Sequence, residues 1–157
     1  MKFKSLAMSG MIAALYVVLT TAFAPISYGP VQCRVAEALT LLPFYIPEAV
    51  PGLFIGCVIA NFIGGFGLLD VVVGGSATLL AAYWTRKMPN PVLAALPPIL
   101  VNAFFIGVML YYLIGEIPLW AGVLYVGLGQ AAACLLLGIP LARMLEKRGL
   151  LHRRSNK

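Results

Sequence analysis

The chain has 157 residues, of which 62% are hydrophobic and only 10% are charged, and its formal net charge is +6. Soluble domains average about 45–50% apolar and about 25% charged residues, so this composition excludes a soluble domain, a disordered tail and a nucleic-acid reader. The sequence contains no G-x-x-x-x-G-K-[ST] motif, and its three cysteines and single histidine lack metal-ligand spacing. We therefore expect an integral membrane protein that is not an enzyme and uses no cofactor or metal.

Uncharged segments separated by Pro and Gly turn signals predict six helices in chain order. They cover residues 5–24, 36–47, 50–66, 69–86, 91–114 and 118–143. The first is about 30 Å long as a helix, enough to cross a bilayer. The second is only about 18 Å long, so it is either tilted or completed by irregular backbone buried in protein. The predicted fold class is all-α, an integral membrane bundle of six transmembrane helices, with five spans and a re-entrant segment as the alternative.

Basic residues indicate the orientation of this bundle. With six spans and the N-terminus inside, ten of the 11 Lys and Arg residues fall in cytoplasmic regions, and only Arg34 lies outside. This agreement with the positive-inside rule predicts that the N- and C-termini are both cytoplasmic. We expect one membrane-embedded domain over residues 1–157, with an external first loop at about 25–36 and a basic cytoplasmic tail at 144–157.

Ionisable residues near the external helix ends are candidates for a binding site. Arg34, Glu37 and Asp70 lie there, and such groups need a partner, water or a ligand at membrane depth. We expect them to converge on an outward-opening cavity. Each also has a simpler interpretation, because Arg34 and Glu37 have the i, i+3 spacing of an ion pair. Asp70 directly precedes an apolar run and suits a helix N-cap.

Amide and aromatic residues in the predicted helices extend this candidate site. Asn102 and Gln130 lie on helices with aromatic residues above them, and we expect both at the site. Each of the three amides, Asn61, Asn102 and Gln130, could instead form an interhelical hydrogen bond, and for Asn61 we prefer this interpretation. Tyr112 and Trp120 are candidates for stacking on a planar ligand, or else they belong to an interfacial aromatic belt.

Small residues recur at helical spacing on two of the predicted helices. One helix carries a stripe at every fourth position, and the first helix has a shorter strip at its cytoplasmic end. The stripe consists of Gly52, Gly56, Ala60 and Gly64, and the strip of Gly10 and Ala14. Such stripes allow close approach of backbones, either within the chain or against a partner helix.

Two segments resemble the QueT family. They are P-I-S-Y-G-P-V-Q-C-R-V-A-E-A-L-T-L-L-P at 25–43 and, before it, A-A-L-Y-V-V-L-T at 13–20. Members of this family are substrate-binding S components of energy-coupling factor (ECF) transporters, assigned to uptake of queuosine precursors. The resemblance implies a six-helix protein of a prokaryotic cell membrane that works with a transmembrane coupling subunit and two cytoplasmic ATPases. It also implies that Gly10 and Ala14 correspond to the Ala-x-x-x-Ala strip that S components offer to the coupling subunit.

The implied cargo, a deazaguanine base, has a chemistry that the candidate residues can meet. Its N–H edge suits a carboxylate, its carbonyl and ring nitrogen suit amide or guanidinium donors, and its flat face suits an aromatic ring. We assign Glu37 or Asp70 to the donor edge, Asn102, Gln130 and Arg34 to the acceptors, and Tyr112 or Trp120 to stacking. The preference between cyano, aminomethyl and free base stays open.

Three other functions remain as alternatives. The same fold suits an S component for another flat vitamin or nucleobase, because the pocket decides the cargo. A small ion-coupled secondary transporter would need a titratable carboxylate near mid-membrane, whereas the acids here lie near predicted helix ends. Composition alone also leaves a structural or assembly protein open. A membrane enzyme is disfavoured because the predicted spans contain no histidine and no D-x-x-D motif.

Overall fold

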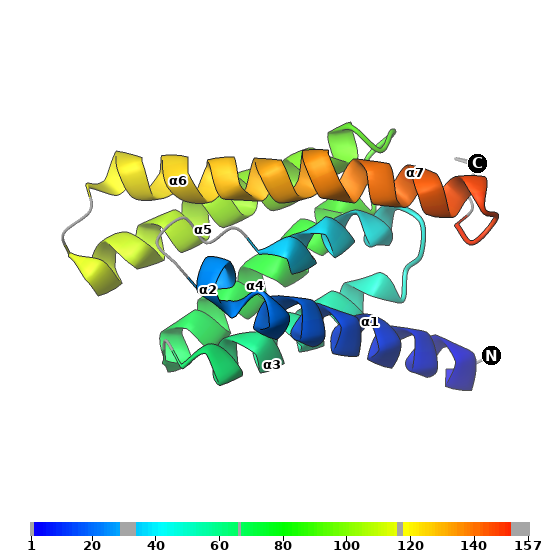
Figure 1. Ribbon diagram of the computed structural model, residues 1–157, viewed down its shortest axis with the longest axis horizontal. Helices are drawn as coiled ribbons and strands as arrows, with labels where there is room; N and C mark the ends of the chain where they lie inside the picture. The colour runs from blue at the N-terminus through cyan, green and yellow to red at the C-terminus, as the bar shows by residue number, and fades with distance from the viewer. Residues whose placement is uncertain (1, 29–33, 66, 116–117, 152–157) are drawn as a thin grey trace.

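The computed structural model describes residues 2–28, 34–65, 67–115 and 118–151, and all regular secondary structure in these ranges is helical (Figure 1). The α-helices are α1 (Lys2–Ala22), α2 (Ala24–Ser27), α3 (Ala49–Gly64), α4 (Leu68–Thr85), α5 (Leu96–Ile114), α6 (Leu119–Ala131) and α7 (Ile139–Lys147). Three further segments are η1 (Val35–Phe44) and η2 (Leu93–Ala95), which are 3₁₀-helical, and η3 (Ala132–Gly138), which is π-helical. The predicted all-α class is confirmed for the described residues.

Among the described residues, four helical segments are long and apolar enough to cross a membrane. They are Phe3–Ala22, Leu68–Thr85, Leu93–Leu113 and Leu119–Lys147. The other two predicted spans correspond to shorter apolar helices, Val35–Phe44 and Ala49–Gly64. Each of the six predicted segments is therefore helical, but length and composition qualify only four as spans, and the count of six stays a prediction.

The short second segment, η1, lies inside the bundle. Nine of its ten residues are buried, and it contacts α1, α3, α4, η3 and α7. A 3₁₀-helix rises about 2.0 Å per residue, so ten residues cover about 20 Å where an α-helix would cover about 15 Å. This burial agrees with the alternative in which the segment is surrounded by protein, because its backbone needs no contact with lipid.

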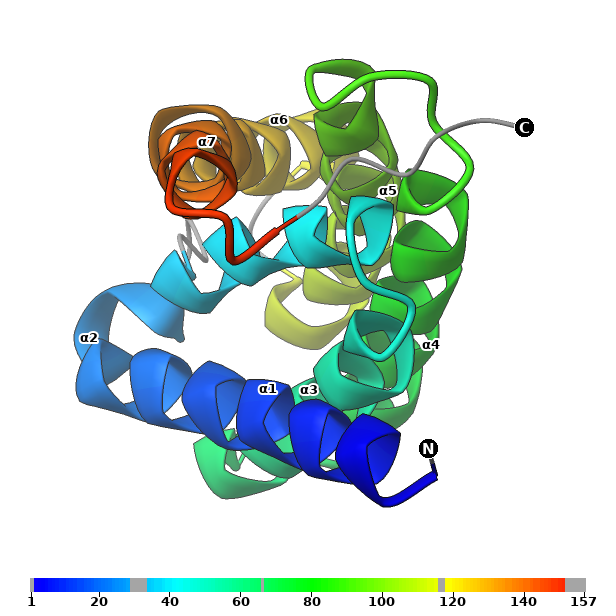
Figure 2. The ribbon, with the colours of Figure 1, turned by 90° about the vertical axis from the view of Figure 1, so that its right-hand side faces the viewer.

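The helices run roughly along one direction around η1. In Figure 1, α6, η3 and α7 form one continuous helix, and the two ends of the described chain lie at the same end of the molecule. Figure 2, viewed from that end, shows η1 between α1 and the α6–α7 helix, with α4 and α5 at the right. Of the predicted first loop at 25–36, residues 29–33 lie outside the described part, and the rest is largely taken up by α2 and the start of η1. Of the predicted tail at 144–157, residues 144–147 belong to α7 and 152–157 lie outside the described part.

The small-residue stripe of α3 is used within the chain. A Cβ atom added at Gly52 would lie 2.8 Å from the Ser9 carbonyl oxygen, and one added at Gly56 would lie 2.8 Å from the Tyr16 Cβ. Both glycines therefore bring α3 into direct backbone contact with α1. Gly10, by contrast, is exposed on α1, and a Cβ there would meet nothing within 4 Å.

This difference predicts opposite responses to the same substitution. We expect Gly52→Ala to lower the melting temperature in detergent, because overpacking of a tight contact costs about 1–3 kcal/mol. Gly10→Ala, the matched control on the exposed face of α1, should leave the melting temperature unchanged or slightly raised. Thermal unfolding of both variants measures this, and a Gly52→Ala protein as stable as the wild type would contradict the proposed packing role.

Candidate functional site: a polar cavity inside the bundle

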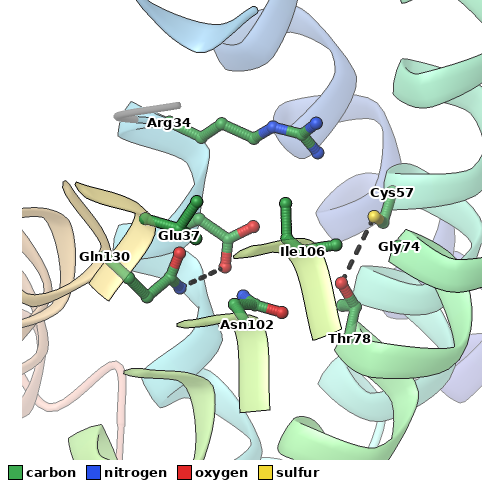
Figure 3. A pocket seen from close by; sticks show the side chains of 9 residues that line it. Arg34, Glu37, Cys57, Gly74, Thr78, Asn102, Ile106 and Gln130 are labelled. Carbon is green, nitrogen blue, oxygen red and sulfur yellow. Dashed lines mark hydrogen bonds between the residues drawn. The ribbon is translucent and has the colours of Figure 1, made fainter. Parts of the chain in front are cut away.

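A polar cavity lies where η1 meets four of the surrounding helices. Its walls come from the residue before η1 and from η1, α3, α4, α5 and α6 (Figure 3). The lining residues are Arg34, Glu37, Cys57, Gly74, Thr78, Asn102, Ile106, Val126 and Gln130. Four of the predicted site residues, Arg34, Glu37, Asn102 and Gln130, are therefore brought together from segments that are far apart in the sequence.

The cavity is narrow in this conformation. About 280 Å³ of empty space lies between the lining side chains, including the open mouth. The lining side chains approach one another so closely that only about one water molecule fits within this space. Pockets for small molecules usually measure about 300–1,000 Å³, so a planar base needs the side chains around the cavity to move apart.

The Glu37 carboxylate is the centre of the site. It is 3% exposed, and each of its oxygens accepts one hydrogen bond from another helix. The Tyr16 hydroxyl donates to Oε1 at 2.5 Å, and the Gln130 amide donates to Oε2 at 2.8 Å. A carboxylate has about four acceptor positions, so both oxygens keep capacity for a further donor. Figure 3 shows this carboxylate between Gln130, Asn102 and Arg34.

Arg34 is held at one end of the cavity by residues of three other segments. Its Nη1 donates to the Asn61 Oδ1 at 2.7 Å and its Nε to the Ser27 carbonyl oxygen at 3.4 Å. Its Nη2 lies 4.0 Å from the Asp70 Oδ1 and makes no hydrogen bond with the described residues. The guanidinium carbon also lies 5.7 Å from the centre of the Tyr28 ring, within the range of a cation–π contact.

The ion pair between Arg34 and Glu37 that the i, i+3 spacing favours is not formed. Within the described residues, Arg34 is instead within 4.0 Å of Asp70, and Glu37 is bound by neutral donors. The physical reason is competition, because neighbouring helices supply partners to each side chain from a different direction. Both groups therefore keep free hydrogen-bonding positions beside the cavity.

Asp70 is buried next to this cluster but does not line the cavity. It lies in the first turn of α4, whose N-cap is Gly67, and no side chain caps that helix end. The predicted N-cap role is therefore corrected. Asp70 is 0% exposed, and neither carboxylate oxygen has a hydrogen-bond partner among the described residues. A buried carboxylate in this state calls for a water molecule, an ion or a ligand to satisfy it.

Asn61 connects the two charged residues. It accepts the hydrogen bond from Arg34 and donates to the Asp70 carbonyl oxygen at 2.9 Å, so it joins α3 to α4. Gly74, one turn further along α4, leaves the space that the Asn61 amide occupies, since a Cβ there would overlap the amide nitrogen. The preferred interpretation of Asn61 as an interhelical hydrogen-bonding residue agrees with this geometry.

Asn102 offers an unused amide to the cavity. It is 5% exposed, lines the cavity, and makes no hydrogen bond to another described side chain or backbone group. On the α4 wall, the Thr78 hydroxyl donates to the Cys57 sulfur at 3.2 Å. Ile106 and Val126 provide the apolar surface. The arrangement suits a flat molecule with hydrogen-bonding edges.

Tyr112 and Trp120 do not lie at this cavity. Their side chains are 76% and 69% exposed, so the predicted stacking has no support in this geometry, and their exposure fits the alternative of an interfacial belt. The reason is helical drift: ten residues at about 100° each leave Tyr112 about 80° away from the face that carries Asn102. Aliphatic Ile106 and Val126 occupy the positions next to the cavity instead.

Tyr16 is the principal residue that sequence reasoning missed. It is 0% exposed in the middle of α1, an apolar helix. A phenol hydroxyl at such a position needs a hydrogen-bond partner, and this need was the sequence signal that could have identified Tyr16.

Tyr28 lies in the predicted first loop, where its hydroxyl donates to the Ala60 carbonyl oxygen at 2.7 Å. Partial burial raises the pKa of the Tyr28 hydroxyl, against the opposing effect of the Arg34 charge.

Comparison with known proteins agrees with the resemblance seen in the sequence. A queuosine precursor transporter QueT from Lactococcus lactis subsp. cremoris (strain MG1363) is 45% identical over 71 residues, which are 44% of this chain and 41% of that protein. The aligned part therefore spans less than half of this relative. No solved structure matches the chain. The family model described as QueT transporter matches residues 6–147, which is most of the sequence. The chain therefore belongs to the QueT transporter family.

Proposed function

We propose that this protein is the membrane-embedded substrate-capture subunit of an ECF-type ABC importer, which binds a queuosine precursor from outside the cell. The observation that carries this proposal is the buried Glu37 carboxylate, held by Tyr16 and Gln130 with acceptor positions left beside the cavity. Membership of the QueT transporter family supports the choice of cargo.

A deazaguanine base fits the chemistry of the cavity. Its N–H edge would donate to Glu37, and its carbonyl would accept from the free amide of Asn102 or from the Nη2 of Arg34. Ile106 and Val126 would cover the flat face in place of an aromatic ring. Asp70 contributes through Arg34, which it approaches to 4.0 Å.

Substitutions in the cavity should weaken cargo binding selectively. Hydrogen bonds to a charged group contribute about 1.5–3 kcal/mol, so we expect Glu37→Gln to lower the affinity for 7-deazaguanine about tenfold or more. Asn102→Ala should weaken binding to a smaller extent, because the amide is neutral. Tyr112→Ala and Trp120→Ala are the controls on exposed aromatics and should bind as the wild type does. Calorimetric titration in detergent measures these affinities.

The same titration separates this proposal from its alternatives. Tight binding without added sodium or a proton gradient supports an S component, whereas strict dependence on either ion supports the small ion-coupled transporter. Wild-type affinity in both the Glu37→Gln and Asn102→Ala proteins would reject the assigned site. Tighter binding of another flat vitamin or nucleobase would keep the fold and change the cargo.

The proposed topology has six spans, with both termini in the cytoplasm and one domain over residues 1–157. The first loop at 25–36 then faces outside and the basic tail at 144–157 faces inside. The common position of the two described chain ends supports this arrangement (Figure 1), as does the clustering of basic residues at the same predicted side. The proposed location is the cell membrane of a prokaryote, which membership of the QueT transporter family supports.

Labelling with a membrane-impermeant thiol reagent tests this topology. In a protein without native cysteines, we expect Leu119→Cys to react from outside intact cells, because it begins α6 at the predicted external end. Lys87→Cys follows α4 at the predicted cytoplasmic end and should react only after the cells are opened. The reverse pattern would overturn the orientation.

The proposed partners are a transmembrane coupling subunit and two cytoplasmic ATPases, because this chain carries no ATPase motif. Gly10 and Ala14 are the proposed contact, and both are exposed on α1, on a face that α3 does not cover. A strip of small residues on an exposed membrane helix allows another helix to approach closely.

Bulky substitutions on this strip should disrupt assembly. We expect Gly10→Leu and Ala14→Leu to reduce co-purification with a co-expressed coupling subunit and its ATPases, because a large side chain separates the two backbones. Affinity for 7-deazaguanine should not change, since neither residue lines the cavity. Val18→Ala, on an exposed position of the same helix, is the control and should assemble normally. Undiminished co-purification of both leucine variants would exclude this surface as the contact.

A further inference from the structure

We infer that Tyr16 is a positioning residue, which keeps the Glu37 carboxylate separate from Arg34 and open to the cargo. The inference rests on the proposed function for the identity of the cargo. It starts from an unexpected feature of the site: two buried, oppositely charged side chains three residues apart line one cavity without forming an ion pair.

This separation needs a physical cause, because opposite charges attract strongly in a poorly polarisable interior. Arg34 is held by Asn61 and Ser27 and lies 4.0 Å from Asp70, which leaves its Nη2 without a hydrogen bond among the described residues. That Nη2 is a free donor for any carboxylate that can reach it. The position of Glu37 therefore depends on the donors that hold its two oxygens.

Tyr16 is the donor that is best fixed in place. Its ring is fully buried, and its hydroxyl lies 2.5 Å from the Glu37 Oε1, the distance of a charge-assisted O–H···O⁻ bond. Gly56 of α3 allows this burial, since a Cβ there would lie only 2.8 Å from the Tyr16 Cβ. The phenol is thus held by packing between α1 and α3, so the carboxylate is oriented before any ligand arrives.

Loss of the Tyr16 hydroxyl would leave the buried Oε1 without its hydrogen-bond donor. The free Nη2 of Arg34 would then be the substitute partner, and an Arg34–Glu37 ion pair would occupy the acceptor positions that the cargo needs. Gln130 holds only the other oxygen, Oε2, so it does not prevent this rearrangement.

Tyr16→Phe tests the inference, because it removes only the hydroxyl. We expect about tenfold weaker binding of 7-deazaguanine, and little further loss when the substitution is added to Glu37→Gln. The loss should be smaller for 7-deazahypoxanthine, which lacks the exocyclic amine and so makes one fewer contact with the carboxylate. Tyr45→Phe is the matched control: Tyr45 is 4% exposed, packs against Phe44, and does not line the cavity. Wild-type affinity in Tyr16→Phe, an additive loss with Glu37→Gln, or an equal loss for both bases would overturn the inference.

A measurement without cargo keeps the inference independent of the proposed function. The infrared carboxylate stretch of Glu37, identified by its absence in Glu37→Gln, should shift in Tyr16→Phe and stay unchanged in Tyr45→Phe. If Tyr16→Phe does not fold, Gly56→Ala displaces the same ring and should produce the shift instead. An unshifted band overturns the role of Tyr16. A wild-type protein that binds no deazaguanine overturns the proposed function alone, because the infrared band still tests whether Tyr16 positions the Glu37 carboxylate.

Discussion

The burial of charged side chains in an apolar helical bundle is the constraint on which the site depends. Arg34, Glu37 and Asp70 are each at most 6% exposed. A buried charge is strongly unfavourable unless neighbouring groups supply hydrogen bonds or an opposite charge. Neutral residues around the cavity serve this need for two of the three charges: Tyr16 and Gln130 bind Glu37, while Asn61 binds Arg34. The remaining hydrogen-bonding positions of these groups are what a polar cargo can use.

Helix packing brings these donors within reach. The glycines of α3 let it contact the backbone of α1, which places Tyr16 beside η1. On the other side of η1, the π-helical segment η3 begins at Ala132, two residues after Gln130, and Gly138 at its end lies against the Ala38 carbonyl oxygen. π-helical turns inside longer helices are frequent at functional sites, because the extra residue shifts the direction of nearby side chains. Glu37, on the first turn of η1, is thus bonded to Tyr16 of α1 on one side and to Gln130 of α6 on the other.

Part of the site was predictable from the sequence. Glu37, Arg34, Asn102 and Gln130 stand out because charged and amide groups are rare and costly in apolar helices, and the structure gathers all four at one cavity. The partners of Arg34 and Glu37 were not predictable. Their i, i+3 spacing favours a pair between the two residues, and it carries no information about hydrogen-bonding groups on distant helices. Tyr112 and Trp120, the candidates for stacking, do not line the cavity: ten residues separate each of them from Asn102 or Gln130, and the helical phase drifts over that distance.

The sequence by itself determined the helical class, the positions of the apolar segments and the family, because hydropathy and charge act locally and leave a periodic pattern in the chain. The tertiary structure alone decided that Tyr16 holds Glu37, that Asp70 faces Arg34 instead of capping α4, and that Gly52 and Gly56 of α3 pack on α1. These contacts join residues between 16 and 130 that only the three-dimensional packing brings together. Local sequence spacing cannot predict which of several hydrogen-bonding groups a buried charged side chain will contact, because that depends on how distant helices pack.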